Sequence, residues 1–545
     1  MKEREYIVTL HNYEDLDSFY EDMETPGGNL YIPNRRVTVA HRRPSSRNTH
    51  YMLTDREAEM VKNDPRVLSV ELDFKESGVS IVPSWTQTSN LWNKSSSINS
   101  LHTNWGLLRV IEGQQRLNWG SDGITTVTGT AKTTSSGKNV DVVIVDGHMD
   151  PNHPEFAVNS DGTGGSRVNQ FNWFSLNPEV LGTSPTTYLY TPYVDNSNNE
   201  RTTDNDHGAH VAGIMAGNTC GWARDANIYN INPYSSAPSP TSFLIDYIRQ
   251  WHRTKPINPI TGRRNPTITN HSYEIIVSLP ITQINSIRFR GVLYNGPFIP
   301  KQLPNYGIPI FNILNIALPV RSIAYEQDLL DAINDGIIVV GAAGNSGIKI
   351  ANYSNDVSDD YNNYVVRNTG SIYYYMRGSL AAGNSIICVG GISSSVSQTK
   401  LSYSNCGPRI DLYAPGQRII SSVNSSNGVV ASDVRNSSYK LAKFSGTSMA
   451  APHVAGVIAC LAETQQRLTQ QQAIEYITSN AKVGQLTSTN GGLADTTDLL
   501  GSTNRYLYYQ KERQEQGLIS PALSNGIRPN SGMVFPRAKI YRYGT

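Results

Sequence analysis

The sequence has almost no excess of positive or negative charge. Its 545 residues include 46 lysines and arginines against 45 aspartates and glutamates, a net charge of +1, and only 17% of the residues are charged. Without a basic surface field, long-range electrostatics attract neither nucleic acid nor anionic membranes. We therefore expect no nucleic-acid partner and a surface made largely of uncharged polar groups.

Long apolar runs are missing as well. The longest apolar stretch, 308–320, is interrupted by Asn312, Asn315 and Pro319, which argues against a transmembrane helix. The first ten residues, MKEREYIVTL, lack the apolar centre of a secretory signal and alternate as a strand does. These two features predict cytoplasmic synthesis and no membrane partner.

Cysteine is also scarce. The chain has four cysteines without a CxxC pair, at Cys220, Cys388, Cys406 and Cys460. Few and widely spaced cysteines predict buried thiols in a protein made in a reducing compartment. A hairpin could bring Cys388 and Cys406 together, so one disulfide remains the alternative.

The N-terminal region carries a compact series of strand and helix signals. Residues 1–76 alternate between strand and helix signals, and the second helix opens with a capping box, Thr54 to Glu57. The expected strands are 4–10, 36–42, 50–53 and 66–73, and the expected helices are 16–23 and 54–64. This βαββαβ order predicts a ferredoxin-like α+β domain, a fold that many functions share.

A larger α/β pattern follows a Ser/Asn-rich linker at 77–103. Short runs of β-branched residues at 140–145, 336–340 and 385–389 alternate with helical stretches at 207–216, 325–334 and 449–463. Uninterrupted apolar strands between helices predict a doubly wound, mostly parallel sheet over 104–500. Segments 274–321 and 348–383 interrupt this alternation of strands and helices, and we interpret them as insertions. We expect an extended tail at 501–545.

Two segments of this region place chemically active residues at element ends. A buried strand ends in Asp146, at the edge where parallel sheets hold their sites, although a turn-forming aspartate is the alternative. The segment DHGAHVAG opens a helix with His207 and His210. These histidines could be metal ligands, although no HExxH motif accompanies them. They could instead be structural residues that cap the helix or lie buried.

Two other segments combine glycine turns with polar side chains. The turn GAAGNSG carries Asn345 and lacks the GK[ST] of a phosphate loop, so its amide either points into a site or serves the turn. The segment FSGTSMAAPHVAG places Ser448 where a loop enters a helix of small residues. Free N–H groups and the helix dipole at that end would stabilise an oxyanion beside the serine hydroxyl.

In the chain order Asp, His, Ser, these segments resemble the subtilisin-like serine proteases (subtilases, peptidase family S8). The resemblance covers about residues 104–500 and includes NWGLLR at 104–109, HPEF at 153–156 and LYAPG at 412–416. The N-terminal βαββαβ block at 1–76, especially residues 53–73, resembles the subtilase propeptide (inhibitor family I9). The implied fold is a subtilisin-like doubly wound sheet preceded by a small ferredoxin-like propeptide domain.

The resemblance implies a serine endopeptidase, made as a proenzyme, that acts on proteins or peptides. Ser448 would be the nucleophile, His207 its base and Asp146 the acid that orients the base. Asn345 and the Ser448 N–H would bind the oxyanion. The chain's own propeptide is an expected partner, released by cleavage after about residue 73 and before about residue 104.

Substrate binding is implied by the same resemblance. The expected substrate-binding residues are Ser272, Tyr273, Ala343 and Gly344. Glu274 stands where the family has a small residue, and its carboxylate either favours basic substrate side chains or is solvated at the surface. No metal site or cofactor is expected. Calcium is known in the family, but the segment 217–221 is too short for its strong site.

Departures from the family pattern leave alternatives open. Gly147 and His148 follow Asp146 where the family has Thr/Ser and Gly, and Ala209 replaces a threonine. A histidine at 148 requires a backbone without a positive φ. One alternative is a weak or inactive subtilase fold in a larger assembly, such as a phage virion, contacted through the tail. The other is a metal hydrolase that uses His207 and His210.

Overall fold

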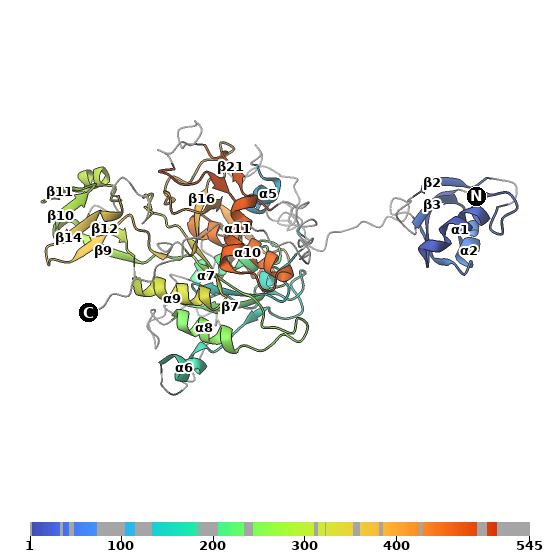
Figure 1. Cartoon of the computed structure of the whole chain (residues 1–545), viewed down its shortest axis with the longest axis horizontal. Coiled ribbons are helices and arrows are strands. Elements are labelled where there is room, and N and C mark those ends of the chain that lie inside the picture. Colours follow the sequence, from blue (N-terminus) through green and yellow to red (C-terminus); the bar gives the residue numbers. More distant parts are fainter. Residues whose placement is uncertain are drawn as a thin grey trace, which may run out of the picture. The chain divides into compact units, whose positions relative to one another are not determined.

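The computed structural model describes residues 3–32, 36–42, 48–72, 104–114, 133, 135–181, 184, 205–233, 244–309, 314–321, 323–352, 360–380, 385–424, 429–487 and 499–509. The predicted linker (77–103) and most of the predicted tail (501–545) lie outside the described residues. The chain divides into two compact units, Met1–Ser84 and Trp85–Thr545, and each is described by itself (Figure 1). None of the described helices is long and apolar enough to cross a membrane.

The first unit has the predicted βαββαβ order. Its elements are β1 (Arg4–Leu10), α1 (Leu16–Glu24), β2 (Thr38–Arg42), β3 (Asn48–Leu53), α2 (Asp55–Lys62) and β4 (Val67–Leu72), and the antiparallel sheet runs β2-β3-β1-β4. Alternate residues of β1 are buried, and both helices pack their apolar side chains into one core. The predicted capping box forms, since Thr54 and Glu57 each bond the other's backbone N–H.

A nine-stranded sheet organises the second unit, in the order β21-β22-β17-β16-β13-β8-β5-β7-β6. All neighbouring strands are parallel except β21 and β22. The strands are β5 (Asp141–Val145), β6 (Val168–Asn169), β7 (Asn227–Ile231), β8 (Thr267–His271), β13 (Ile338–Ala342), β16 (Ile387–Ile392), β17 (Leu412–Pro415), β21 (Lys482–Val483) and β22 (Arg505–Tyr506). The predicted doubly wound, mostly parallel sheet is therefore confirmed.

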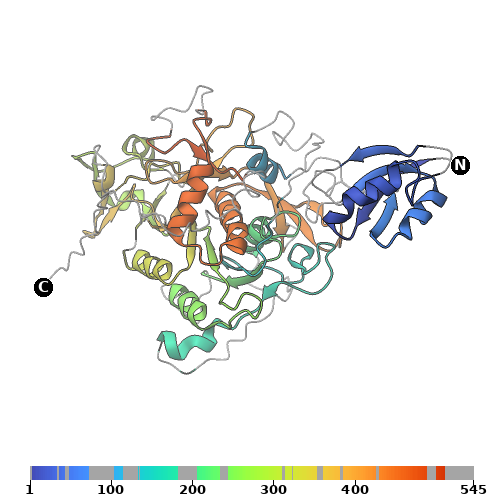
Figure 2. The same cartoon turned by 45° about the vertical axis from the view of Figure 1, so that its right-hand side comes forward.

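Helices cover both faces of this sheet. They are α5 (Trp105–Glu112), α6 (Asn177–Leu181), α7 (Asn205–Ala216), α8 (Leu244–Thr254), α9 (Ile323–Asn334), α10 (Thr447–Thr464) and α11 (Gln470–Asn480). Val142 and Ile144 share a core with α7 and α10, whereas Val143 and Val145 share a core with α8 and α9. Because successive strand residues point to opposite faces, every residue of β5 is buried. Figure 2 shows α8 beside α9 and α10 beside α11.

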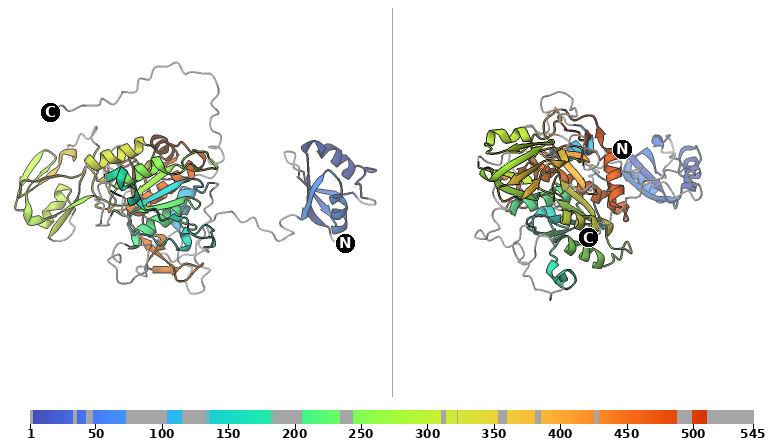
Figure 3. Two further views of the ribbon diagram at one scale, coloured as in Figure 1. Left: turned by 90° about the horizontal axis from the view of Figure 1, so that it is seen from below. Right: turned by 60° about the vertical axis from the view of Figure 1, so that its left-hand side comes forward.

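The two predicted insertions fold together into one lobe. It contains β9 (Ile276–Pro280), β10 (Ile284–Phe289), β11 (Val292–Asn295), β12 (Asn315–Pro319), β14 (Tyr364–Arg367) and β15 (Ile372–Tyr374). Strands β9 and β12 pair with each other, and the other four form a sheet in the order β11-β10-β14-β15. Residues from both segments share one apolar core, and Figure 3 shows the lobe as a separate body at one side of the large sheet.

A small three-stranded sheet supports the helix that carries the histidines. Strands β18 (Ile419–Val423), β19 (Val429–Ser432) and β20 (Lys440–Phe444) are ordered β18-β20-β19. A Cβ atom built on Gly213 of α7 would lie 2.1 Å from Ser421 Oγ, so only glycine allows this helix to approach the sheet so closely.

All four cysteines are buried, and none of them forms a disulfide. The alternative of a Cys388–Cys406 disulfide is therefore wrong, and the prediction of buried thiols is confirmed. Burial raises the pKa of the Cys388 thiol to about 12, so this side chain stays neutral and packs as an apolar group.

Candidate active site

The polar residues at the centre of the second unit meet because three strands end together. In the parallel neighbours β5 and β8, Val145 pairs with His271, and Gly341 of β13 pairs with the same histidine. The residues that follow these strands therefore lie at the carboxyl edge of the sheet, where open α/β sheets place their sites. They are Asp146, Ser272 and the turn 343–347.

Asp146 and His207 form a direct pair at this edge. His207 Nδ1 lies 2.8 Å from Asp146 Oδ1, which also accepts the Gly147 N–H at 2.7 Å. The Asp146 side chain is fully buried, and its other oxygen, Oδ2, has no hydrogen-bond partner among the described residues. The family's hydroxyl residue after the aspartate is a glycine here, so this chain lacks that donor beside the carboxylate.

Small residues let the helix of His207 approach the turn after Asp146. A Cβ atom built on Gly208 would lie 2.0 Å from the Gly147 carbonyl oxygen. The next residue of the turn, His148, does not adopt a positive φ. A histidine is therefore accommodated at this position without the backbone strain that the sequence raised as a concern.

Ser448 is the second residue of α10, and its carbonyl lacks the usual hydrogen bond within the helix. Pro452 lies one turn later and has no N–H to donate to the Ser448 carbonyl. The Ser272 hydroxyl takes that place, donating to the Ser448 carbonyl at 3.0 Å, while Ser448 Oγ donates to the Ser272 carbonyl at 3.1 Å. This reciprocal pair holds the serine at the strand end.

Asn345 is fixed beside the same helix end. Its Oδ1 accepts the Thr447 N–H at 2.9 Å and lies 3.2 Å from Thr447 Oγ1. Since a backbone N–H only donates, the amide oxygen must face Thr447. Both ends of the amide lie beside Gly446, the residue before the helix, because a Cβ atom built there would be 3.5 Å from Nδ2 and 3.6 Å from Oδ1. The Asn345 amide, which carries an N–H donor at Nδ2, thus lies beside the start of the helix that carries Ser448.

Asn405, which sequence reasoning missed, braces the turn that carries Asn345. Its Nδ2 donates to the Ala343 carbonyl at 2.8 Å, its Oδ1 accepts the N–H groups of Ser346 and Ile348 at 3.1 Å, and its own N–H bonds the Gly344 carbonyl. The side chain is fully buried. An asparagine between two loops carries no local pattern that could have revealed this role.

The extended residues 272–275 divide between the site and the core. Tyr273 and Ile275 pack against the core on the α8 side of the sheet, and the Tyr273 hydroxyl lies 3.0 Å from His271 Nδ1. Ser272 and Glu274 point the other way. The structure thus gives the Tyr273 side chain a packing position, and of the expected substrate-binding residues it brings Ser272, Ala343 and Gly344 to the site.

Glu274 is half-buried and is held at the site by two hydrogen bonds. Its Oε2 accepts the Asn345 N–H at 3.2 Å and its Oε1 accepts Asn405 Nδ2 at 3.3 Å. Burial raises the pKa of this carboxyl group, although the two hydrogen bonds oppose the shift. The carboxylate thus bonds two N–H groups of the site, and its preference for basic substrate side chains stays a prediction.

His210 does not share a site with His207. Its Nε2 lies 2.9 Å from the Ile419 carbonyl and 3.1 Å from that of Ala442, and its ring stacks on Phe444. Burial lowers the pKa of His210 to about 3, so the ring is a neutral structural group. Within the described ranges, no cluster of three His, Cys, Asp or Glu side chains could hold a metal ion, and the metal-hydrolase alternative loses its support.

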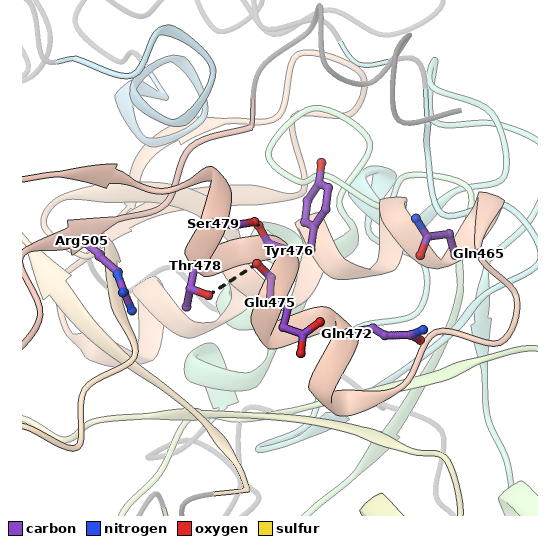
Figure 4. A pocket seen from close by; sticks show the side chains of 7 residues that line it. All are labelled: Gln465, Gln472, Glu475, Tyr476, Thr478, Ser479 and Arg505. Carbon is purple, nitrogen blue, oxygen red and sulfur yellow. Dashed lines mark hydrogen bonds between the residues drawn. The ribbon is translucent and has the colours of Figure 1, made fainter. Parts of the chain in front are cut away.

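A polar hollow elsewhere on the second unit contains none of these groups. Figure 4 shows it on α11, lined by Gln465, Gln472, Glu475, Tyr476, Thr478, Ser479 and Arg505. Its one drawn hydrogen bond runs from the Thr478 hydroxyl to the Glu475 backbone carbonyl. The hollow offers neither a nucleophile paired with a base nor a turn of N–H donors, so the sheet edge is the better candidate.

Comparison with known proteins agrees with this geometry. The chain is 27% identical over 306 residues to an alkaline proteinase of Hapsidospora chrysogena, covering 56% of this chain and 52% of the relative. It is 29% identical over 150 residues to the major intracellular serine protease of Bacillus subtilis (strain 168), covering 28% and 36% of the two chains. The matches thus span about half or less of these relatives.

Among solved structures, a cold adapted subtilisin-like serine proteinase is similar, with 21% identity and a TM-score of 0.42 over 74% of this chain and 97% of that chain. The model of the subtilase family (peptidase S8) matches residues 137–506, which include Asp146, His207, Asn345 and Ser448. The chain belongs to the subtilase family and has its subtilisin-like α/β fold.

Proposed function

We propose that the protein is a serine endopeptidase whose nucleophile is Ser448. The proposal is supported by the Asp146–His207 pair after β5, by the bond of Ser448 to Ser272 after the neighbouring strand β8, and by the Asn345 amide at the start of α10. The names of the relatives, an alkaline proteinase and an intracellular serine protease, support the same reaction.

The proposed reaction is acyl transfer. The Ser448 hydroxyl turns from the Ser272 carbonyl toward His207, gives up its proton to the imidazole and attacks a peptide carbonyl. Asp146 holds the imidazole in the tautomer that can accept this proton. Its negative charge then stabilises the positive charge of the imidazolium. Because that carboxylate is fully buried, water screens its attraction for the imidazolium only weakly.

The oxyanion that forms would lie between two donors, Asn345 Nδ2 and the Ser448 N–H. A donor of this kind contributes about 10²–10³ in kcat in other serine proteases. His207 then returns its proton to the leaving amine, and water hydrolyses the acyl-enzyme. Every group in this sequence of steps is a side chain or backbone atom of the second unit.

We further propose that the N-terminal unit is a propeptide and that the protein removes it by its own activity. The βαββαβ fold of this unit and its position before the catalytic domain support a proenzyme. The cut would fall between residues 73 and 104, where sequence composition predicts a linker.

N-terminal sequencing of the purified chain beside Ser448→Ala tests both proposals. We expect the wild type to lose the first unit and to degrade casein, and the variant to stay full length and inactive. A wild-type chain that stays intact and leaves denatured casein uncut would contradict the peptidase proposal. That outcome would support a structural component of a larger assembly instead.

A further inference from the structure

The carboxylate of Glu274 occupies the narrow space between two backbone segments of the site. Residues 272–274 form one side and the turn 343–345 forms the other. A Cβ atom built on Gly344 would lie only 1.9 Å from Glu274 Oε1, and Gly344 adopts a φ of +102°. Both the space and the backbone conformation therefore require glycine at 344, and the carboxylate lies directly against its Cα.

This carboxylate is next to the atoms that would react. Its Oε2 accepts the backbone N–H of Asn345, the residue whose side chain faces the helix end of Ser448. In the proposed reaction, the substrate carbonyl that is attacked lies between Ser448 Oγ and Asn345 Nδ2. The substrate residue that supplies this carbonyl is P1, and its side chain would lie beside residues 343–345. A long P1 side chain would thus extend toward Glu274.

Within the described part of the chain, no cation pairs with Glu274. The carboxylate accepts two amide N–H groups, and among the residues that the structure describes it forms no ion pair. Arg290 and Lys349 both bond Asp360 in the inserted lobe. A half-buried carboxylate is less well solvated than an exposed one, so a cation brought by the substrate would gain a charge-assisted interaction with it.

Unused lone pairs are available for such a cation. A carboxylate has about four acceptor positions, and the two amide bonds leave about two of them for a guanidinium or ammonium group. An apolar P1 side chain at the same place would remove more water from the carboxylate without neutralising its charge.

We infer that Glu274 is the specificity-determining residue of this site and that it selects lysine or arginine at P1. This inference rests on the proposed peptidase function and adds its substrate class. A carboxylate that simply blocks the space would instead restrict P1 to small residues such as alanine.

The test uses fluorogenic peptides that differ only at P1, with Lys, Arg, Gln, Leu and Ala. For the wild type we expect kcat/KM with Lys or Arg to exceed that with Leu by about 10- to 100-fold, the effect of one charge-assisted contact. In Glu274→Gln this ratio should fall below about 5. Glu475→Gln changes an exposed carboxylate on α11 and should keep the wild-type ratio.

The outcomes separate this inference from the proposed function. Labelling of Ser448 by a fluorophosphonate, which carries no P1 side chain, reports the nucleophile alone. If wild type is labelled but cleaves Leu or Ala peptides as well as Lys peptides, the inference about Glu274 is wrong and the peptidase proposal stands. An unchanged ratio in Glu274→Gln would also overturn it.

The variant is not the only test of the inference. If Glu274→Gln does not fold, peptide aldehydes ending in arginine or leucine can compete with the fluorophosphonate on the wild type. Protection of Ser448 at about 10-fold lower concentration by the arginine aldehyde supports the assignment, and equal protection contradicts it. Absence of both labelling and peptide cleavage would contradict the proposed function itself.

Discussion

A buried ion pair ties the segments of the site together and predicts how stability depends on pH. Glu155 lies shortly after Asp146 and accepts the backbone N–H groups of Thr219 and Cys220, just beyond α7, at 2.9 and 3.0 Å. The same carboxylate bonds the guanidinium of Arg435, near the small β18-β20-β19 sheet. Removing its charge should therefore loosen several segments at once.

The magnitude follows from the pKa of Glu155. Burial alone would raise it, but Arg435 and the bonds from Thr219 and Cys220 outweigh burial and lower it from 4.5 to about 2. Between these two values the unfolded chain binds a proton that the folded chain does not. The contribution to the unfolding free energy is thus complete above about pH 4.5 and is lost as pH falls toward 2. A shift of about 2.5 pH units corresponds to about 3 kcal/mol.

Urea unfolding of Ser448→Ala, which avoids self-digestion, and of the same protein with Glu155→Gln measures this contribution. All seven tryptophans lie after Ser84, and Trp105, Trp173, Trp222 and Trp251 are buried in the second unit, so the fluorescence change reports its unfolding. We expect the two unfolding free energies to converge by about 3 kcal/mol between pH 6 and pH 2. The control Glu475→Gln, at an exposed position, should leave the dependence unchanged. Parallel pH profiles for Glu155→Gln and its parent would refute the reasoning.

Three further substitutions test the geometry of the site. Asn345→Ala should lower kcat for a peptide by about 10²–10³ with little change in KM, and an unchanged kcat would remove Asn345 from the oxyanion site. Gly208→Ala places a Cβ atom 2.0 Å from the Gly147 carbonyl and should lower the unfolding free energy by about 1–3 kcal/mol and abolish peptide cleavage; wild-type behaviour would contradict the close packing. Ser272→Ala leaves the buried Ser448 carbonyl without its donor and should cost about 1–3 kcal/mol in urea unfolding, whereas Ser272→Thr should restore most of it.

Local patterns predicted the elements that carry the site. The β-branched run before Asp146 and the small residues after Ser448 are strong signals, because a strand buried on both faces and a helix buried on all sides tolerate few other residues. The capping box at Thr54 is equally local, and its hydrogen bonds form as expected. Such features depend on neighbours within a few positions along the chain.

The features that were missed depend on distant partners. The two insertions share a sheet because Ile287 of β10 pairs with Val365 of β14, and nothing near either residue specifies that register. The carboxylate of Glu274 bonds Asn405, which is 131 positions away. An isolated glutamate after a strand is more often solvated, so its contact with the Asn345 turn became visible only in the structure.

Covalent labelling of Ser448 tests the central claim most directly. The folded chain is treated with a fluorophosphonate and digested, and the modified peptide is identified by mass spectrometry. We predict a single adduct on Ser448, abolished in Ser448→Ala and formed at least about 10²-fold more slowly when His207→Ala removes the base. A folded protein that forms no adduct, or one whose labelling is unaffected by His207→Ala, would contradict the account.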